Sequence, residues 1–184
     1  MTMFAGFSRR ALLVGAACLV AARAGRAHTP YRQWDVYRRK HLLVGTCRAD
    51  PESYPLGQRL VSMLVSGLPE SKARVTRAPD QKRLASLLTT EQLELVLFTL
   101  DEAVALEAGK PPFSDYGPYP LRLVFEVDGY ALVCGEAFPA RHAWLVTEAL
   151  AEHLPAPDGL VASTRLALHE GTRAFLSGEP QPEG

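Results

Sequence analysis

The sequence predicts a single-domain α/β protein with a mostly parallel sheet and flanking helices. At 184 residues the chain has the length of one domain. Short apolar runs typical of buried strands alternate with segments in which leucines recur at helical spacing. The order strand, helix, strand, helix, strand implies parallel strands that are joined by crossover helices.

Three strands and three helices are predicted for the first half of the domain. Pro55 suits the first turn of the first helix, and Gly67 is typical of its end. Asp80 is the predicted cap of the second helix. Asp101 is the predicted cap of a short third helix, which Gly109 ends. The predicted strands are 41–46, 73–78 and 93–100.

The second half begins with a proline-rich loop at 110–120 that carries several aromatic residues. Two strands follow, and the Asp-Gly pair at 128–129 between them is typical of a hairpin or a bent pair of strands. Pro139 opens what we predict to be the longest helix, and a short helix is expected around 170–176.

The first 27 residues have the pattern of an export signal. The twin arginines Arg9 and Arg10 precede an apolar stretch, and small residues at Ala24 or Ala27 suit cleavage. The apolar stretch is shorter than the ~20 residues that span a bilayer, so an uncleaved membrane anchor is only the alternative. We therefore expect a periplasmic protein. The predicted segments are a twin-arginine-like signal at 1–27, an arm at 28–40, the domain at 41–178 and a disordered tail at 179–184.

Charge and composition exclude several classes of partner. The signal holds four arginines and no acidic residue, which leaves 16 lysines and arginines against 20 acidic residues in the rest of the chain. A weakly acidic chain without a basic cluster argues against nucleic acid and against anionic membranes as partners. Cys47 and Cys134 either form a disulfide in an oxidising compartment or remain separate buried thiols. The histidines lack the spacing of a metal site, and no cofactor is predicted.

Two strand ends form the candidate ligand site. Free backbone N–H groups and the helix dipole favour an anion where a helix begins. Ligands of open α/β sheets lie at the carboxyl ends of the strands. Such points follow the first and the third predicted strand. The alternative is a pair of ordinary strand–helix turns. The candidate ligand residues are Thr46, Cys47, Tyr54, Thr99 and Asp101.

Enzymatic activity is not predicted. Cys47 lies near the start of a helix, but the sequence places no base beside it, and an inert thiol is the simpler interpretation. The chain contains no GxSxG nucleophile motif. The acidic pairs of the sequence are better explained as caps and solvated helix faces than as acid–base catalysts.

The aromatic loop has two interpretations that the sequence does not separate. Tyr and Phe side chains on a stiff loop bind partner proteins at low cost in conformational entropy. On that basis Phe113, Tyr116 and Tyr119 are candidate partner-binding residues. The alternative is a structural crossover whose aromatic rings pack on the sheet.

Taken in order, several segments resemble the TAXI family, the periplasmic solute receptors of TRAP-type transporters. "LVGTCRADPESYPLG" resembles the family's Gly-Thr strand end and its Tyr-Pro-Leu-Gly helix start, at Gly45, Thr46 and 54–57. "RLASLLTTEQLELVLFTLDEAVAL", "LVCGEAFPARHAWLVTEALAEHL" and "LHEGTRAFLSGE" resemble later segments. The resemblance covers about residues 41–178 and implies one periplasmic-binding-protein type II-like lobe. It also implies a small organic anion as ligand, such as a carboxylate, and TRAP membrane subunits as partners.

Two departures limit what the resemblance implies. The family has two lobes with the ligand between them, whereas the segment that would build the second lobe is missing here. The family's glycine-rich loop is replaced by "CRADPES", whose Asp50 and Glu52 would repel a carboxylate. A second copy of the chain or another protein would then have to close the crevice. The rival hypothesis is an accessory subunit of a co-exported redox enzyme, with the arm and the aromatic loop as docking surfaces.

Overall fold

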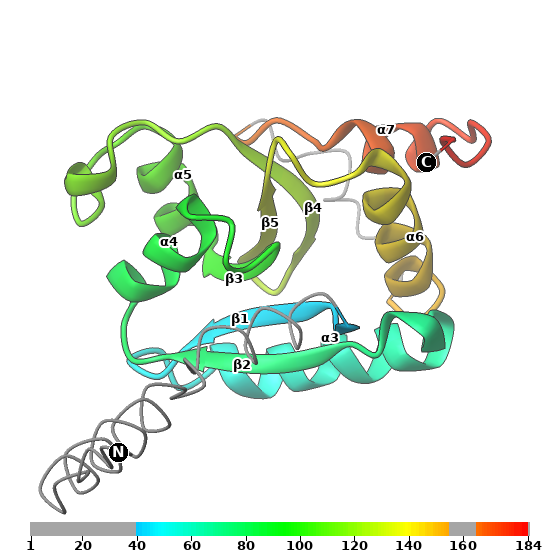
Figure 1. Cartoon of the computed structure of the whole chain (residues 1–184), viewed down its shortest axis with the longest axis horizontal. Helices are drawn as coiled ribbons and strands as arrows, with labels where there is room; N and C mark the ends of the chain where they lie inside the picture. The colour runs from blue at the N-terminus through cyan, green and yellow to red at the C-terminus, as the bar shows by residue number, and fades with distance from the viewer. Residues whose placement is uncertain (1–39, 155–164, 184) are drawn as a thin grey trace, which may run out of the picture. The chain divides into compact units, whose positions relative to one another are not determined.

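A five-stranded sheet with helices on both faces carries the fold (Figure 1). The structure is a computed structural model that describes residues 40–154 and 165–183, all within one unit, Tyr37–Gly184. The predicted export signal and the arm before Lys40 lie outside the described residues. With the labels of Figure 1, the elements are β1 (Leu43–Cys47), α3 (Ser53–Gly67), η1 (Pro69–Ser71), β2 (Arg74–Ala78), α4 (Gln81–Thr89), β3 (Leu95–Thr99), α5 (Leu100–Glu107), η2 (Ser114–Tyr116), β4 (Leu121–Val127), β5 (Tyr130–Gly135), α6 (Ala140–Ala151) and α7 (Glu170–Leu176).

The strands lie in the order β2-β1-β3-β5-β4. β1 is parallel to both β2 and β3, whereas β5 is antiparallel to both β3 and β4. β4 therefore runs in the same direction as the first three strands, and β5 alone is reversed. Asp128 and Gly129 join β4 to β5 with positive φ angles of 52° and 79°, as a tight hairpin requires. The α/β class and the hairpin are confirmed. The sheet is mixed, not mostly parallel as predicted, since β5 pairs antiparallel with both of its neighbours.

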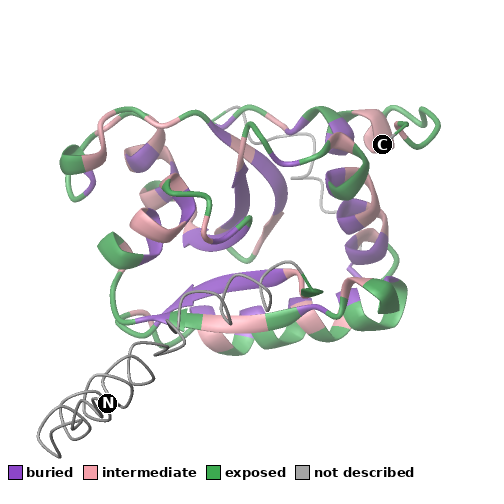
Figure 2. Cartoon of the chain, viewed as in Figure 1, coloured by how far each residue is buried: buried purple, intermediate pink, exposed green. Residues whose placement is uncertain are grey.

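Hydrophobic side chains fill both faces of the sheet. The strands other than the edge strand β2 are largely buried (Figure 2). Along β3, Leu95 and Leu97 belong to the cluster under α3 and α6, while Val96 and Phe98 belong to the cluster under α4 and α5. A strand that is covered on both faces shows a continuous apolar run instead of an alternating one. This is why β3 was recognisable in the sequence.

Two predicted helix features differ in the structure. Thr99, not Asp101, caps α5: its hydroxyl accepts a hydrogen bond from the Glu102 N–H (3.3 Å), and the Glu102 carboxylate accepts one from the Thr99 N–H (3.1 Å). The chain passes from β3 to α5 without a loop, so Asp101 falls within the first turn. Among the described helices, α3 with 15 residues is longer than α6 with 12, contrary to our expectation.

The C-terminal segment covers the outer edge of β4. Leu168 forms a parallel bridge to Leu123, whose N–H donates to the Ala167 carbonyl at 2.8 Å. Glu179, the first residue of the predicted disordered tail, accepts a hydrogen bond from the Trp144 indole N–H at 3.4 Å. Residues 179–183 have no regular secondary structure. In the ranges that the structure describes, no helix has the length and apolar character of a membrane span.

Candidate functional site

The predicted ligand-binding hydroxyls at the strand ends are already engaged within the chain. Thr46 is fully buried, and its hydroxyl donates to the Thr76 carbonyl at 2.9 Å. The Thr99 hydroxyl serves as the cap of α5. Cys47 is buried, and its N–H donates to the Ser53 hydroxyl at 3.1 Å. These groups therefore stabilise the β1–α3 and β3–α5 junctions and are not directed at a ligand.

A carboxylate of the chain itself lies beside the N-terminus of α3. One oxygen of Asp50 accepts from the Glu52 N–H at 3.1 Å, and the other accepts from the Tyr130 hydroxyl at 2.8 Å. Burial, together with the hydrogen bond to Asp50, raises the pKa of Tyr130. Because a fixed negative charge near this helix start repels a second one, Asp50 disfavours the anionic ligand that we predicted here.

Tyr130 also connects the two predicted strand ends. It is the partner of Thr99 in the β3–β5 ladder, and its hydroxyl reaches Asp50 on the β1–α3 loop. Sequence analysis missed this residue, since a tyrosine after an Asp-Gly turn carries no functional signal of its own. The remaining two predicted ligand residues, Tyr54 and Asp101, also contact other side chains of the chain. The Arg77 guanidinium lies 4.3 Å from the centre of the Tyr54 ring, and Asp101 pairs with Arg165 at 2.7 Å.

The aromatic loop packs inward, which corrects the prediction of Phe113 as a surface residue. Phe113 is fully buried and meets Phe98 edge-on, with ring centres 5.7 Å apart. The Tyr116 hydroxyl donates to the Lys82 carbonyl at 2.8 Å, and the Tyr119 ring is partly buried against Gly135. The interpretation of this loop as a packed crossover therefore fits better than a docking surface.

The two cysteines are separate buried thiols. Cys47 belongs to the core cluster on the α4 and α5 face of the sheet, and Cys134 belongs to the cluster on the opposite face. Burial raises the pKa of Cys47, and it raises the pKa of Cys134 to about 12. A buried thiol whose pKa is raised stays protonated near neutral pH and reacts slowly.

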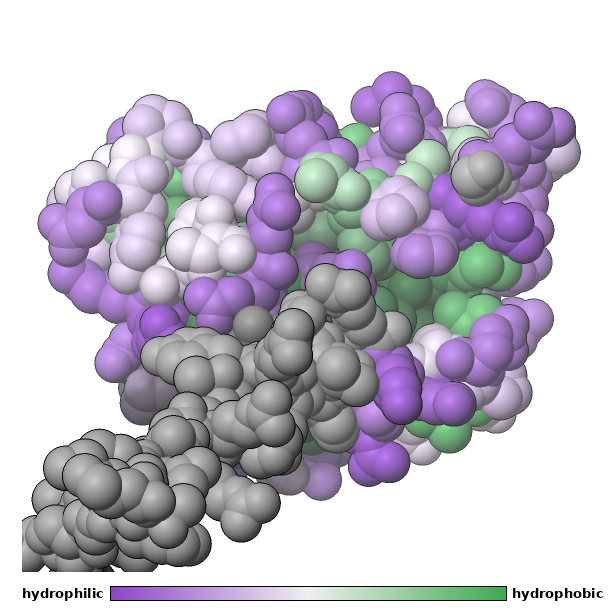
Figure 3. All heavy atoms as spheres, in the orientation of Figure 1, coloured by the Kyte–Doolittle hydropathy of each residue, from purple (hydrophilic) through white to green (hydrophobic). Residues whose placement is uncertain are grey.

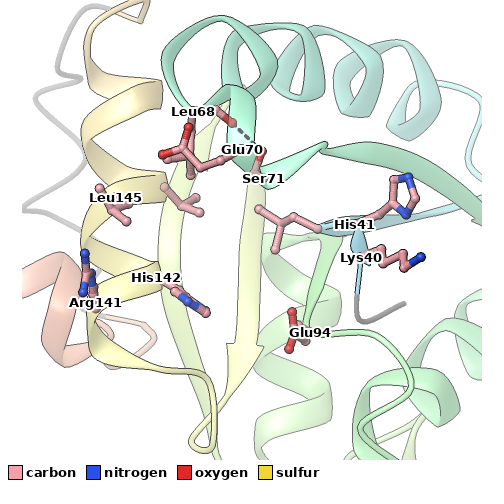
Figure 4. Close-up of a pocket in the computed structure, with 11 residues that line it drawn as sticks. Lys40, His41, Leu68, Glu70, Ser71, Glu94, Arg141, His142 and Leu145 are labelled. Carbon is pink, nitrogen blue, oxygen red and sulfur yellow. Dashed lines mark hydrogen bonds between the residues drawn. The ribbon is translucent and has the colours of Figure 1, made fainter. Parts of the chain in front are cut away.

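A cavity of about 530 Å³ lies at the opposite end of the sheet, where the first three strands begin (Figure 4). We call it the amino-end pocket. Leu42 directly precedes β1, Glu94 directly precedes β3, and α6 contributes its first turn. The pocket is lined by Lys40, His41, Leu42, Leu68, Glu70, Ser71, Glu94, Arg141, His142, Leu145 and Val146.

The amino-end pocket combines an apolar floor with a charged rim. Leu68 and Val146 are buried in the floor, beside the partly buried Leu42 and Leu145. Apolar residues gather in the hollow between α6 and the C-terminal end of α3 (Figure 3). Four exposed charges, which we call the rim charges, surround the floor; they are Lys40, Glu70, Glu94 and Arg141.

Within the part of the chain that the structure describes, the side chains of the rim charges form no hydrogen bond or ion pair with one another or with other residues. In the view of Figure 4, Arg141 and His142 lie on one side of the pocket, Lys40 lies on the other, and Glu94 lies between them. Such uncommitted charges are available to a ligand. Sequence analysis missed this set because charged residues from four distant segments carry no shared motif.

A buried cluster of hydrogen bonds between α6, α7 and β4 holds the first turn of α6 in place. His169 caps α7; its Nε2 lies 2.8 Å from the Phe138 carbonyl, and its Nδ1 accepts from the Gly171 N–H at 3.1 Å. The Thr147 and Thr172 hydroxyls are 2.9 Å apart. Both face the carbonyl of Val124, which the β-bulge in β4 releases from the ladder.

Comparison with known proteins adds no family assignment. The sequence matches no protein-family model and no curated protein. Within residues 40–154 and 165–183, no three His, Cys, Asp or Glu side chains are grouped so that they would hold a metal ion. The amino-end pocket, with its apolar floor and charged rim, is therefore the feature from which a function is inferred.

Proposed function

We propose that this chain is a non-catalytic, exported solute-binding domain, a single lobe of the TAXI-like periplasmic type, and that it binds a small organic anion in the amino-end pocket. The observation that carries this proposal is the apolar floor bordered by rim charges that form no ion pair with any described residue. A volume of about 530 Å³ is within the range of small-molecule sites, roughly 300–1,000 Å³. The α/β sheet with helices on both faces is compatible with such a lobe.

The anionic group of the ligand is expected at the first turn of α6. The first N–H groups of a helix have no partner within the helix, and the helix dipole is positive there. No side chain caps α6, since Pro139 occupies the cap position. Arg141 and His142, both in this turn, add a guanidinium and an imidazole to the lining of the pocket. A carboxylate here would receive charge-assisted hydrogen bonds.

The two carboxylates of the rim restrict the ligand to a single negative charge. Glu70 follows α3, and Glu94 precedes β3, so a second anionic group that extended across the pocket would meet one of them. The apolar floor offers Leu68 and Leu145 to the body of the ligand. The ligand class is therefore a monocarboxylate with a short aliphatic or branched body.

This proposal moves the ligand away from the carboxyl ends of the strands. There, Thr46 and Thr99 are committed to the backbone, and Asp50 supplies a fixed negative charge. Under the rival hypothesis of an accessory subunit, the N-terminal arm remains as the docking surface, because Phe113 of the aromatic loop is part of the core.

Isothermal titration of the full chain with three ligands of matched size tests the proposal. Isocaproate is a branched monocarboxylate, isocaproamide is its neutral counterpart, and adipate is a dianion. We expect isocaproate to bind most tightly. Arg141→Gln should weaken its binding roughly fivefold to tenfold, because a charge-assisted hydrogen bond is lost at an exposed site.

The matched control is Arg83→Gln, which removes an exposed arginine from α4, away from the pocket. It should leave the affinity unchanged. The absence of isocaproate binding, or equal binding of all three ligands, would refute the proposal. Equal losses in the Arg141 and Arg83 variants would show that only net charge matters.

A further inference from the structure

The two edges of the sheet differ in how they are covered. The segment around Leu168 pairs with the outer edge of β4. β2 is the other edge strand, and within the described ranges it pairs with β1 alone (Figure 1). An uncovered edge presents backbone donors and acceptors that can pair with another strand.

The ladder to β1 shows which backbone groups of β2 are directed outward. The Arg74 N–H donates to Leu42, and the Ala78 carbonyl accepts from Arg48, both at 2.9 Å. In a parallel pair, alternate residues bond to the same neighbour. Val75 and Arg77 therefore direct their N–H and C=O groups away from β1, and they form a two-residue template for a further strand.

A groove of mixed character accompanies this edge. A cavity of about 410 Å³ between α3 and β2 is lined by the apolar Val61, Ala73 and Val75 and by the polar Gln58, Ser62 and Arg74. One turn farther along α3, Val65 is 45% exposed, and it is a large hydrophobic side chain. The groove offers space for an apolar side chain of an added strand, since alternate residues of a strand point to the same face.

The charge of the edge indicates which partner fits. Lys72, Arg74 and Arg77 are exposed, and they form no ion pair within the described residues. Arg77 is held over the Tyr54 ring. Two copies of this chain that paired through β2 would bring these cations together, which disfavours a homodimer at this edge. An acidic segment meets complementary charge.

We infer that the free edge of β2 binds an extended acidic segment of a partner protein by strand addition. The segment pairs with the backbone of Val75 and Arg77, an apolar residue enters the groove on the α3 face, and the carboxylates of the alternate residues lie on the opposite face, beside Arg74. This surface is separate from the amino-end pocket, so the inference is independent of the proposed ligand.

A labelled heptapeptide in which Glu and Val alternate is the probe, and fluorescence anisotropy on the full chain is the measurement. Two further versions carry N-methyl groups on one or the other alternate set of amides. Only one set faces β2 in a strand-addition complex, so we expect one version to lose binding and the other to retain it. A peptide with Lys in place of Glu should not bind.

Val75→Pro removes an outward N–H while it leaves the ladder to β1 intact, as proline is tolerated on edge strands. We expect about tenfold weaker peptide binding, with a circular dichroism spectrum like that of the wild type. The control Arg83→Gln should bind normally, whereas Arg74→Gln should bind more weakly and with a smaller dependence on salt.

Three results would overturn the inference. They are the absence of peptide binding, binding that survives both N-methylated sets, and a dimer of the wild-type chain that Val75→Pro dissociates. Should Val75→Pro not fold, the N-methylated peptides on the wild-type chain decide the matter alone.

Discussion

The close approach of α3 to β1 leads to a sharp prediction about Gly57. A Cβ atom at this position would lie 2.5 Å from Cγ2 of Thr46 and 3.2 Å from Cγ2 of Val75. Thr46 cannot rotate away without loss, since it is fully buried and its hydroxyl is bonded to the Thr76 carbonyl at 2.9 Å. Gly57→Ala should therefore destabilise the fold, although alanine is the better helix former.

The expected size of the effect follows from opposing terms. Replacing a helical glycine by alanine favours folding by about 1 kcal/mol. Overpacking a buried contact costs about 1–3 kcal/mol, and loss of the Thr46 hydrogen bond would add about 1 kcal/mol. The net expectation is a decrease of about 1–3 kcal/mol in the free energy of unfolding. Propensity alone predicts an increase.

A second substitution isolates the contact. Thr46→Ser keeps the hydroxyl and removes the methyl group, which costs about 1 kcal/mol on its own. In the Gly57→Ala background the new Cβ occupies the space of that methyl, so the second substitution should cost little or restore stability. Urea unfolding of the four proteins gives the coupling energy, which we expect to be about 1–2 kcal/mol. Additivity within ~0.5 kcal/mol would refute the packing argument.

Three further predictions concern titratable groups. Burial lowers the pKa of His169, so the unfolded state binds the proton more tightly than the folded state does. The free energy of unfolding should therefore fall as the pH drops below ~6.5, and it should fall less steeply in His169→Gln. Urea midpoints near neutral pH and at about pH 5 would show the difference. Asp50→Asn should lower the pKa of Tyr130, visible as earlier tyrosinate absorbance in an alkaline titration, and an unchanged curve would contradict the contact. Because burial raises the pKa of Cys47, iodoacetamide should alkylate it near neutral pH more slowly than it alkylates glutathione; rapid alkylation would instead support a thiol-dependent enzyme.

Local features of the fold were largely readable from the sequence. The continuous apolar run of β3 and the Asp-Gly turn before β5 each have a direct physical cause, namely burial on both faces and two residues with positive φ. Asp80 caps α4 as expected, with its carboxylate accepting from the Arg83 N–H at 2.7 Å. The helix around 170–176 was also placed correctly.

The features that could not be predicted from the sequence depend on contacts between distant segments. Thr99 and Asp101 are both good caps, and only the absence of a loop after β3 decides between them. The bond between Asp50 and Tyr130 joins residues 80 positions apart. The amino-end pocket assembles charges from four segments, each of which alone resembles an ordinary solvated position. No local sequence pattern predicts that these charged residues lie close together in the fold.

The position of β5 between β3 and β4 has a consequence for the order in which the chain assembles. β4 is synthesised before β5, yet its ladder partners among the described residues are β5 and the segment near Leu168. Within these residues β4 thus has no strand to pair with until later residues have left the ribosome. The hairpin must add to β3 as a preformed pair, or β5 must enter a gap that is already bordered on both sides. Either route makes the sheet a late event that requires residues up to Gly135, so that chains shorter than this retain an exposed β3 edge and depend on protection from aggregation.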